Sequence, residues 1–352
     1  MIDKTHHLVF LTPGFPYGEK DSTTIPALQE YLKTLRIQFP EVKMTVITFQ
    51  YPFQKENYLW NGINVIPLNG KNLRMKKIWI WKKAMSFLKK IHNQSLITII
   101  HSFWIGECSL IGQKFSSQYG VKHIVTAMGQ DVYKNNRYIK LLSNSNASVI
   151  TLSKNHQKEL FKNSGFHSTI IPWSVDTKKF PDISSNTIDI LGVGSLNEIK
   201  NYHLFIDIID TLVREFPNLT TEIIGDGKLR YSLENYIKQK KLTNTIVLTG
   251  KLSRKNVLKK MATANVLLHT SSYESFGYVF AEALYSGMQI VSFDVGATID
   301  IPQWHIGNSN EELVSFTTKI LSKSTQIKKR VLPWTKEDTI LAYTQLYNSR
   351  IS

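Results

Sequence analysis

The sequence predicts an α/β protein of two domains, each built on a parallel β-sheet with helices packed against it. With 352 residues the chain is too long for one small core, and an average of ~150 residues per domain suggests two. Short apolar runs alternate with helical segments along the chain, the pattern of strand–helix–strand units and hence of parallel sheets. Hydrophobic residues make up 42% of the composition, which is enough for globular cores.

Five apolar runs in the first half are expected to be strands, with helices between them. The expected strands are residues 8–11, 45–49, 96–100, 123–126 and 148–152, and the expected helices are 26–39, 113–119 and 153–164. The loop after the first strand contains Gly14 and Tyr17. It has two glycines but lacks the G-x-G-x-x-G spacing, so the sequence does not predict a dinucleotide fingerprint there.

A second domain is expected to begin at residue 176, after the segment IIPWSVD. Its expected strands are 188–193, 246–250, 266–268 and 289–293, with a further strand that ends near Gly225. Its expected helices are 229–240, 256–263, 279–285 and 311–322, with a further helix that begins at residue 202. Residues 335–338 have a cap-like pattern that predicts a final helix over 335–350. The predicted domains are therefore 1–175 and 176–334. These patterns alone do not indicate which of the two domains the final helix joins.

The stretch from Val266 to Ile299 predicts one strand–loop–helix–strand unit that contains two carboxylates, Glu274 and Glu282. Ligands of open α/β sheets bind beyond the carboxyl ends of the strands, where Glu274 is expected. The start of the next helix offers free amides and a dipole that favour an anion such as phosphate. Glu282, about one turn into that helix, could accept hydrogen bonds from ribose hydroxyls. A nucleotide sugar fits this combination, with contacts from Phe276, Gly277, Tyr278 and Val279.

The segment from Glu274 to Glu282, ESFGYVFAE, followed by Ala283-Leu284 and Gly287, resembles the E-x7-E segment of retaining glycosyltransferases of family 4. The resemblance implies the GT-B fold, in which two Rossmann-like domains face each other across a cleft. It also implies that the first domain binds the acceptor, that the second binds the nucleotide sugar, and that helix 335–350 crosses back to the first domain. The alternative is a helix that merely packs against a sheet and carries two glutamates by chance.

A second resemblance concerns the turn from Gly194 to Lys200. It matches the family's G-R-L-x-x-x-K element, whose Arg and Lys neutralise the donor pyrophosphate, except that Ser195 occupies the Arg position. Lys200 is therefore expected to stabilise the leaving diphosphate, either alone or with another basic residue. In relatives the loop near Gly225 holds the nucleotide base through backbone groups, so the base cannot be predicted from side chains. Outside this context, a lysine at a helix start is usually a solvated surface residue.

The first domain supplies the expected acceptor side of the site. Gly129 and Asp131 match the family's H-G-x-D segment, but Met128 replaces the histidine that faces the donor sugar in relatives. Asp131 could position or deprotonate the acceptor hydroxyl, or could instead be a helix N-cap. His101, at a strand end, could line the cleft or be structural. The loop with Gly14 and Tyr17 resembles the first loop of GT-B transferases, which lies near the donor phosphate and the acceptor.

The charge distribution points to an anionic partner of the first domain. Residues 1–175 contain 22 Lys and Arg against 9 Asp and Glu, whereas residues 176–352 contain 21 against 18. Residues 71–92 form a basic amphipathic segment in which one helical face and an adjoining stripe are apolar. The face comprises Ile78, Trp81, Met85 and Leu88, and the stripe beside it comprises Ile80, Ala84, Phe87 and Ile91. Such a helix can lie on an anionic membrane. The equally weighted alternative is an ordinary helix whose apolar face covers the sheet and whose lysines are solvated.

Several classes of protein are not expected. No apolar run approaches the ~18 residues of a membrane span, the N-terminus reads as a strand rather than a signal peptide, and the single cysteine, Cys108, fits a reducing compartment. We therefore expect a cytoplasmic protein, with peripheral attachment to the inner membrane face as an option. No His/Cys cluster has zinc spacing and no D-x-D follows a strand, so no metal or other cofactor is expected.

The leading hypothesis is a retaining, metal-independent glycosyltransferase that uses a nucleotide sugar and a lipid-linked or polysaccharide acceptor. One alternative is a nucleotide-sugar epimerase of the same fold, which the E-x7-E segment disfavours. The other is a non-catalytic module that binds a membrane or nucleic acid, suggested by the net charge of +16 and the changes at Met128 and Ser195; nucleic acid is not the expected partner. The donor, the acceptor and the linkage are not predicted.

Overall fold

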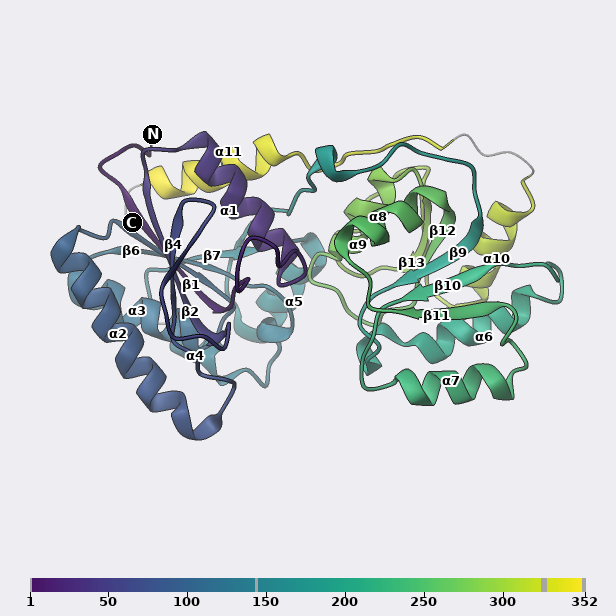
Figure 1. The fold of residues 1–352 in the computed structure, drawn as a ribbon, viewed down its shortest axis with the longest axis horizontal. Coiled ribbons are helices and arrows are strands. Elements are labelled where there is room, and N and C mark those ends of the chain that lie inside the picture. Colours follow the sequence, from purple (N-terminus) through teal and green to yellow (C-terminus); the bar gives the residue numbers. More distant parts are fainter. Residues whose placement is uncertain (1, 143–144, 324–327, 350–352) are drawn as a thin grey trace. The chain divides into compact units, whose positions relative to one another are not determined.

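The computed structural model describes residues 2–142, 145–323 and 328–349. The chain divides into two compact units, one made of Met1–Ser174 with Thr335–Ser352 and the other of Val175–Trp334 (Figure 1). The boundary predicted from the sequence lies one residue later, after residue 175. Each unit has its own sheet and its own cores, and each is described by itself below.

The first unit contains, within its described residues, an eight-stranded sheet in the order β3-β4-β2-β1-β5-β6-β7-β8. Neighbouring strands are parallel, except that β3 and β4 form an antiparallel hairpin. The hairpin and the short β8 were not predicted, and β5 starts later than expected because Leu96 stays exposed in the preceding loop. The strands are β1 (His7–Gly14), β2 (Lys43–Tyr51), β3 (Tyr58–Trp60), β4 (Ile63–Pro67), β5 (Ile99–Phe103), β6 (Lys122–Thr126), β7 (Ser148–Thr151) and β8 (Thr169–Ile170).

Helices cover both faces of this sheet. They are α1 (Pro26–Gln38), α2 (Lys77–Gln94), α3 (Glu107–Tyr119), α4 (Arg137–Leu142), α5 (Lys154–Ser164) and the C-terminal α11 (Lys336–Asn348). Helix α3 begins six residues before the predicted start because Gly106 caps it. There the Ser109 hydroxyl bonds both the amide and the carbonyl of Gly106, each at 3.0 Å.

Helix α2 uses part of its apolar surface in the core. Ile80, Ala84 and Leu88 are buried against the sheet and α3, and Trp81 and Met85 pack beside them. The predicted apolar face is therefore wrong in one respect, since Ile78 is exposed rather than on the buried side. Ile80 and Ala84, which were predicted to lie beside that face, are fully buried together with Leu88, because residues four apart share one side of a helix.

Helix α11 belongs to the first unit, although it follows the second unit in sequence. Tyr343 and Tyr347 are buried, and the Tyr347 hydroxyl bonds Tyr31 and, at 2.7 Å, Nδ1 of His101. The ammonium of Lys122 bonds carbonyl oxygens at the end of α11 and the Ser349 hydroxyl. Because a helix end leaves four carbonyls without intrahelical partners, this lysine satisfies groups that would otherwise need water.

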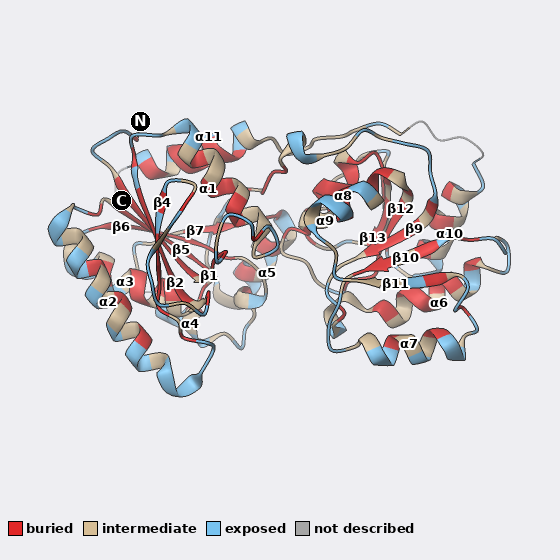
Figure 2. Ribbon diagram, in the orientation of Figure 1, coloured by how far each residue is buried: buried red, intermediate tan, exposed pale blue. Residues whose placement is uncertain are grey.

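The second unit contains, within its described residues, a six-stranded parallel sheet in the order β11-β10-β9-β12-β13-β14. Helices α6, α7 and α10 cover one face, and α8 and α9 cover the other, with a separate hydrophobic core on each side (Figure 2). The strands are β9 (Ile188–Val193), β10 (Thr221–Ile224), β11 (Ile246–Gly250), β12 (Ala264–His269), β13 (Gln289–Phe293) and β14 (Trp304–Gly307), the last not predicted; the helices are α6 (Tyr202–Leu212), α7 (Arg230–Gln239), α8 (Arg254–Thr263), α9 (Tyr278–Tyr285) and α10 (Asn310–Leu321).

Candidate active site

The strand order of the second unit fixes where a ligand can bind. The chain builds β10 and β11 on one side of β9 and then returns to place β12 on the other side. The carboxyl ends of β9 and β12 are therefore the topological switch point, where open α/β sheets bind ligands. Lys200 lies in the loop after β9, and Glu274 lies in the loop after β12.

These two loops bring Lys200 and Glu274 into direct contact. The Lys200 ammonium is ion-paired with Oε1 of Glu274. The same oxygen accepts hydrogen bonds from Nε2 of His269 at 3.0 Å and from the Ser271 hydroxyl at 3.2 Å. The Glu274 side chain is only 14% exposed, and His269 and Ser271 are buried, so the cluster is largely shielded from solvent at the strand ends.

The charge state of Glu274 follows from this environment. Burial alone would raise the pKa of its carboxyl, but the positive charge of Lys200 and the hydrogen bond from His269 outweigh burial and lower the pKa to about 2. Burial also lowers the pKa of His269, against the pull of the carboxylate. The imidazole is therefore neutral near pH 7, and its Nε2 carries the proton that it donates to Glu274.

The Lys200 loop is fixed by hydrogen bonds to the loop of Glu274. The Thr270 hydroxyl donates to the carbonyls of Lys200 and Asn201, both at 3.0 Å, and the Ser272 amide donates to the Ile199 carbonyl at 2.9 Å. Asn197 caps the short turn that contains Lys200. These bonds hold the ammonium and the carboxylate in one geometry before any ligand arrives.

Gly194 and Gly225 allow the strand ends to approach one another. A Cβ added to Gly225, whose φ is +149°, would lie 1.8 Å from the Gly194 carbonyl oxygen. A Cβ on Gly194 would lie 3.0 Å from Cε of Lys200, so the lysine stem runs directly along this glycine. Ser195 is exposed in the same loop. Its predicted contact with the donor stays a prediction.

The start of α9 follows the Glu274 loop. Its N-cap is Gly277, with φ +73°, and no described side chain caps the helix. The loop after β13 packs on this segment, since the Ala297 amide donates to the Phe276 carbonyl at 2.9 Å. The amides of Tyr278 and Val279 thus belong to the first turn of a helix beside an ionised carboxylate and a lysine. Such a helix end favours an anion.

Glu282 is buried one turn into α9, and Arg254 covers it. The Arg254 guanidinium is ion-paired with Glu282 and lies 5.0 Å from the centre of the Tyr278 ring. Arg254 is the first residue of α8, and the Ser253 side chain caps that helix. Glu282 was predicted to accept hydrogen bonds from ribose. The structure adds a guanidinium that a ligand approaching this carboxylate would meet.

Sequence reasoning missed three residues of this site: Arg254, His269 and Ser271. The last two lie at the carboxyl end of β12, within five positions of Glu274, and that position was the available signal. Arg254 lies twenty-eight positions before Glu282 in the sequence. Only the packing of α8 beside α9 joins the two, so no local pattern could have indicated their pairing.

In the first unit the predicted residues are distributed over several loops. Gly14 ends β1, and Tyr17 is exposed in the following loop. Gly129 and Asp131 lie together after β6, where the Asp131 carboxylate accepts the amides of Gly129 at 2.6 Å, Ile105 at 2.7 Å and Met128 at 3.1 Å. Burial raises the Asp131 pKa and these amide bonds oppose that rise. The carboxylate thus holds two loops together, but Asp131 is not the N-cap of the short helical turn, because Gly129 occupies that position. Its predicted role toward the acceptor hydroxyl stays a prediction.

The prediction that His101 lines the cleft needs correction. His101 is buried, Nε2 bonds the Thr126 hydroxyl at 2.8 Å, and Nδ1 bonds the Tyr347 hydroxyl. Burial holds its pKa well below the usual value. The histidine therefore joins β5 to β6 and α11, and its neutral ring is part of an aromatic core with Phe103.

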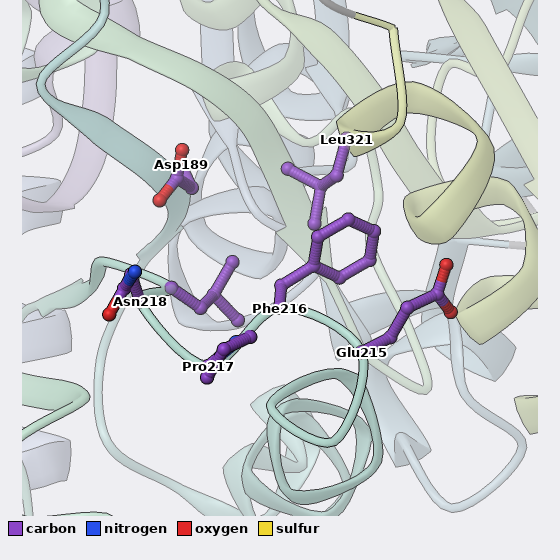
Figure 3. A pocket seen from close by; sticks show the side chains of 7 residues that line it. Asp189, Glu215, Phe216, Pro217, Asn218 and Leu321 are labelled. Atoms are coloured by element: carbon purple, nitrogen blue, oxygen red, sulfur yellow. The ribbon is translucent and has the colours of Figure 1, made fainter.

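A pocket of about 300 Å³ elsewhere in the second unit is not part of this site. It lies at the amino ends of the strands, because Asp189 at the start of β9 is on its wall (Figure 3). Asp189 is already bonded to Thr220 through its amide and hydroxyl. The remaining walls combine polar and apolar side chains. The other lining residues are Glu215, Phe216, Pro217, Asn218, Leu219 and Leu321.

Among residues 2–142, 145–323 and 328–349, no three His, Cys, Asp or Glu side chains lie together as metal ligands would. Over the same ranges, no helix has the length and apolar character required to cross a bilayer.

Two Rossmann-like units, with the C-terminal helix returned to the first, define the GT-B class of glycosyltransferase folds. Solved structures share this architecture: sucrose-phosphate synthase from Thermosynechococcus elongatus superposes with a TM-score of 0.78 at 16% identity, over 97% of this chain and 98% of the other. A glycosyltransferase from Rickettsia africae superposes with a TM-score of 0.74 at 14% identity, over 98% and 100%. Residues 176–303 match the family model of the glycosyl transferases group 1. That match lies entirely within the second unit.

Relatives by sequence carry the same kind of description. An uncharacterized glycosyltransferase of Methanocaldococcus jannaschii is 23% identical over 278 residues, which is 77% of this chain and 76% of that protein. One component of the human phosphatidylinositol N-acetylglucosaminyltransferase is 31% identical over 136 residues, which is 38% of this chain and 28% of that protein. The chain thus spans less than a third of the length of this human relative.

Proposed function

We propose that this chain is a retaining glycosyltransferase that moves a sugar from a nucleotide-sugar donor to a lipid-linked or polysaccharide acceptor, without a metal ion. The observation that carries the proposal is the contact of Lys200, His269 and Ser271 with Glu274 at the switch point of the second unit. Lys200 and Glu274 both lie within the segment that matches the family model. The cluster provides one cation and one ionised carboxylate beside the first turn of α9.

The chemistry of the donor fits these groups. Glycosyl transfer breaks the bond between the anomeric carbon and the diphosphate oxygen, so negative charge develops on the leaving group. Lys200 and the amides of α9 would stabilise that charge, as preorganised donors do in other enzymes. Arg254 is a second cation at this helix, and we include it in the donor site. Its positive charge takes the place of the Arg that the family's G-R-L-x-x-x-K element has where this chain has Ser195.

Glu274 is proposed to orient the donor sugar rather than attack it. Its Oε1 already accepts hydrogen bonds from His269 and Ser271 and pairs with Lys200, which reduces its nucleophilicity. Retention then requires the acceptor hydroxyl to approach on the face that the diphosphate leaves. The anomeric configuration of the glycoside product, compared with that of the donor by NMR, tests this assignment. An inverted product would contradict it.

Two independent observations support the proposed acceptor class. The human relative is named for transfer to phosphatidylinositol, and the first unit carries a net charge of +13 over residues 1–175, from the 22 basic and 9 acidic residues counted above. A lipid-linked acceptor at the cytoplasmic face of a membrane fits both. The alternative of a nucleotide-sugar epimerase predicts donor turnover without any acceptor.

A donor screen tests the proposal. Thermal unfolding of the protein is measured with UDP-, GDP- and ADP-sugars, each with and without EDTA, because a ligand bound only by the native state stabilises it by about 2.7 kcal/mol at one hundred times its Kd. We expect one nucleotide class to raise Tm equally with and without EDTA. If none of them does, the proposed donor site is wrong.

A further inference from the structure

We propose that the start of α2 is a docking surface for a lipid bilayer with anionic headgroups. This surface, the α2 tip, comprises residues 71–79. Four of its apolar side chains are exposed: Leu73 at 49%, Met75 at 99%, Ile78 at 65% and Trp79 at 56%. Single exposed apolar side chains are common, but these four fall within seven positions of the chain, and clustered exposed apolar side chains mark interaction sites.

The charge around the tip selects the partner. Residues 57–106 contain eight Lys and Arg and no Asp or Glu. Lys71, Arg74 and Lys76 are exposed on the tip itself, so basic groups alternate with the apolar ones. Basic groups near anionic headgroups gain about 1 kcal/mol each, and apolar side chains gain by entering the acyl boundary. A nucleic acid would use the charges but would leave Met75 and Ile78 without apolar partners.

The core packing of α2 decides how the helix can meet a bilayer. Ile80, Ala84 and Leu88 are buried against the first unit. That face cannot also enter a membrane, so α2 does not lie flat with its full apolar surface in the lipid. Only the first turns and the preceding loop are available, and they form the exposed end of α2 that lies lowest in Figure 2. The geometry therefore points to docking by the tip.

The tip is held in place by polar contacts beneath it. Lys77 pairs with Glu107 at 2.9 Å, and the Trp81 indole donates to the same carboxylate at 2.9 Å. Gln50 at the end of β2 accepts the amide of Asn72, also at 2.9 Å. Docking thus needs little ordering of the protein, because the apolar side chains project from a backbone that is already fixed.

These contacts also place the tip relative to the sheet of the first unit. Gln50 lies at the carboxyl end of β2, and Glu107 follows β5. The tip is therefore at the edge where the strands end, as are the loops of Tyr17 and Gly129. If the proposed function holds, docking would bring this edge to the surface where a lipid-linked acceptor is presented. The docking itself does not depend on the transferase activity.

Vesicle sedimentation tests the proposal without any sugar donor. The protein is mixed with vesicles of phosphatidylcholine alone or with phosphatidylglycerol added. We expect binding to the anionic vesicles, weakened at least about tenfold by the double variant Met75→Glu, Trp79→Glu, because each loses buried apolar area and adds repulsion. The matched control is Ile37→Glu, at a residue of α1 that is 80% exposed. It should bind as the wild type does.

A second measurement reports on insertion. Cys108 is buried, so a polarity-sensitive thiol dye attached to Met75→Cys reads that position alone. Its emission should shift to the blue on anionic vesicles, whereas the dye on Ile37→Cys should not shift. The proposal is overturned if the Met75→Glu, Trp79→Glu variant binds vesicles as tightly as the wild type, or if the dyes at positions 75 and 37 respond alike. It is also overturned if this double variant loses binding to an oligonucleotide but keeps binding to vesicles. Wild-type protein that binds anionic vesicles but transfers no sugar from any nucleotide-sugar donor would count against the proposed function instead.

Discussion

At the scale of single residues, Lys200 is the side chain on which the proposed donor site depends most. It is held by its backbone loop and its ammonium contacts Glu274, so its removal takes away charge without opening a core. We expect Lys200→Ala to reduce kcat by about 10²–10³-fold, the usual effect of losing one preorganised group that stabilises developing charge. Steady-state kinetics with the donor found in the screen would measure it.

The control for that variant is Lys228→Ala, since Lys228 is an exposed lysine of the same unit that pairs only at the surface with Glu198. It should transfer sugar at the wild-type rate. Equal activity of Lys200→Ala and the wild type would remove Lys200 from the donor site.

Glu274 gives a prediction about pH. Its pKa of about 2 in the folded protein is below its ordinary value of 4.5, so the native state favours the ionised form. The resulting stability is fully present above pH 4.5 and is lost as the pH falls toward 2. In urea unfolding, Glu274→Gln should therefore be less stable than the wild type at pH 6, and this difference should shrink with acidification. A difference that grows toward low pH would contradict the assignment.

Arg254 is predicted to contact the donor phosphates rather than only to neutralise Glu282. Arg254→Gln should weaken nucleoside diphosphate binding about tenfold, as expected for one lost charge-assisted contact, with the exposed Lys255→Gln as control. The decisive comparison repeats Arg254→Gln in a Glu282→Gln background, using titration calorimetry. If the effect vanishes there, Arg254 acts only by holding Glu282.

At the scale of elements, α11 shows how a distant segment completes the first unit. The Tyr347 hydroxyl bonds Tyr31 and His101, and all three are buried. We expect Tyr347→Phe to lower the free energy of unfolding by about 1–3 kcal/mol, because it leaves buried polar groups without a partner. Chemical denaturation monitored by circular dichroism would measure this. An unchanged midpoint would mean that α11 adds little to the unit. Leu341→Ala, at an exposed position on the same helix, is the control.

Some elements could be predicted from the sequence and others could not. The strands with continuous apolar runs, such as β1, β2, β9 and β13, were predicted because buried parallel strands need no polar alternation. The β3–β4 hairpin was missed because the turn at Asn61-Gly62 joins strands of only three and five residues. Strand β14 was missed because its few residues form a strand only by pairing with β13.

The same contrast holds for the site. Glu274 and Lys200 were predicted to be site residues because each lies in the loop after a strand, within a recognisable motif. Arg254 could not be, since its partner Glu282 is reached only through the packing of α8 on α9. His101 was misassigned because its position at a strand end does not reveal that α11 returns over it. Local patterns thus identify strand ends well and long-range partners poorly.

At the scale of the whole molecule, the chain separates its tasks between two units of different charge. The first unit carries the basic surface and the exposed α2 tip, and the second carries the cluster around Glu274. The match to the glycosyl transferases group 1 lies entirely in the second unit. This division suits the proposed transferase, in which the second unit binds the donor and the first unit meets an anionic partner.

The central claim is that the second unit binds a diphosphate through Lys200 and the start of α9 without a divalent ion. The most direct measurement is titration calorimetry of UDP, GDP and ADP into the full chain, in EDTA and in Mg²⁺, for the wild type and Lys200→Ala. We expect that one nucleotide binds the wild type equally in both buffers and that Lys200→Ala weakens this binding at least about tenfold. Binding only in Mg²⁺, or equal binding by Lys200→Ala, would contradict the claim.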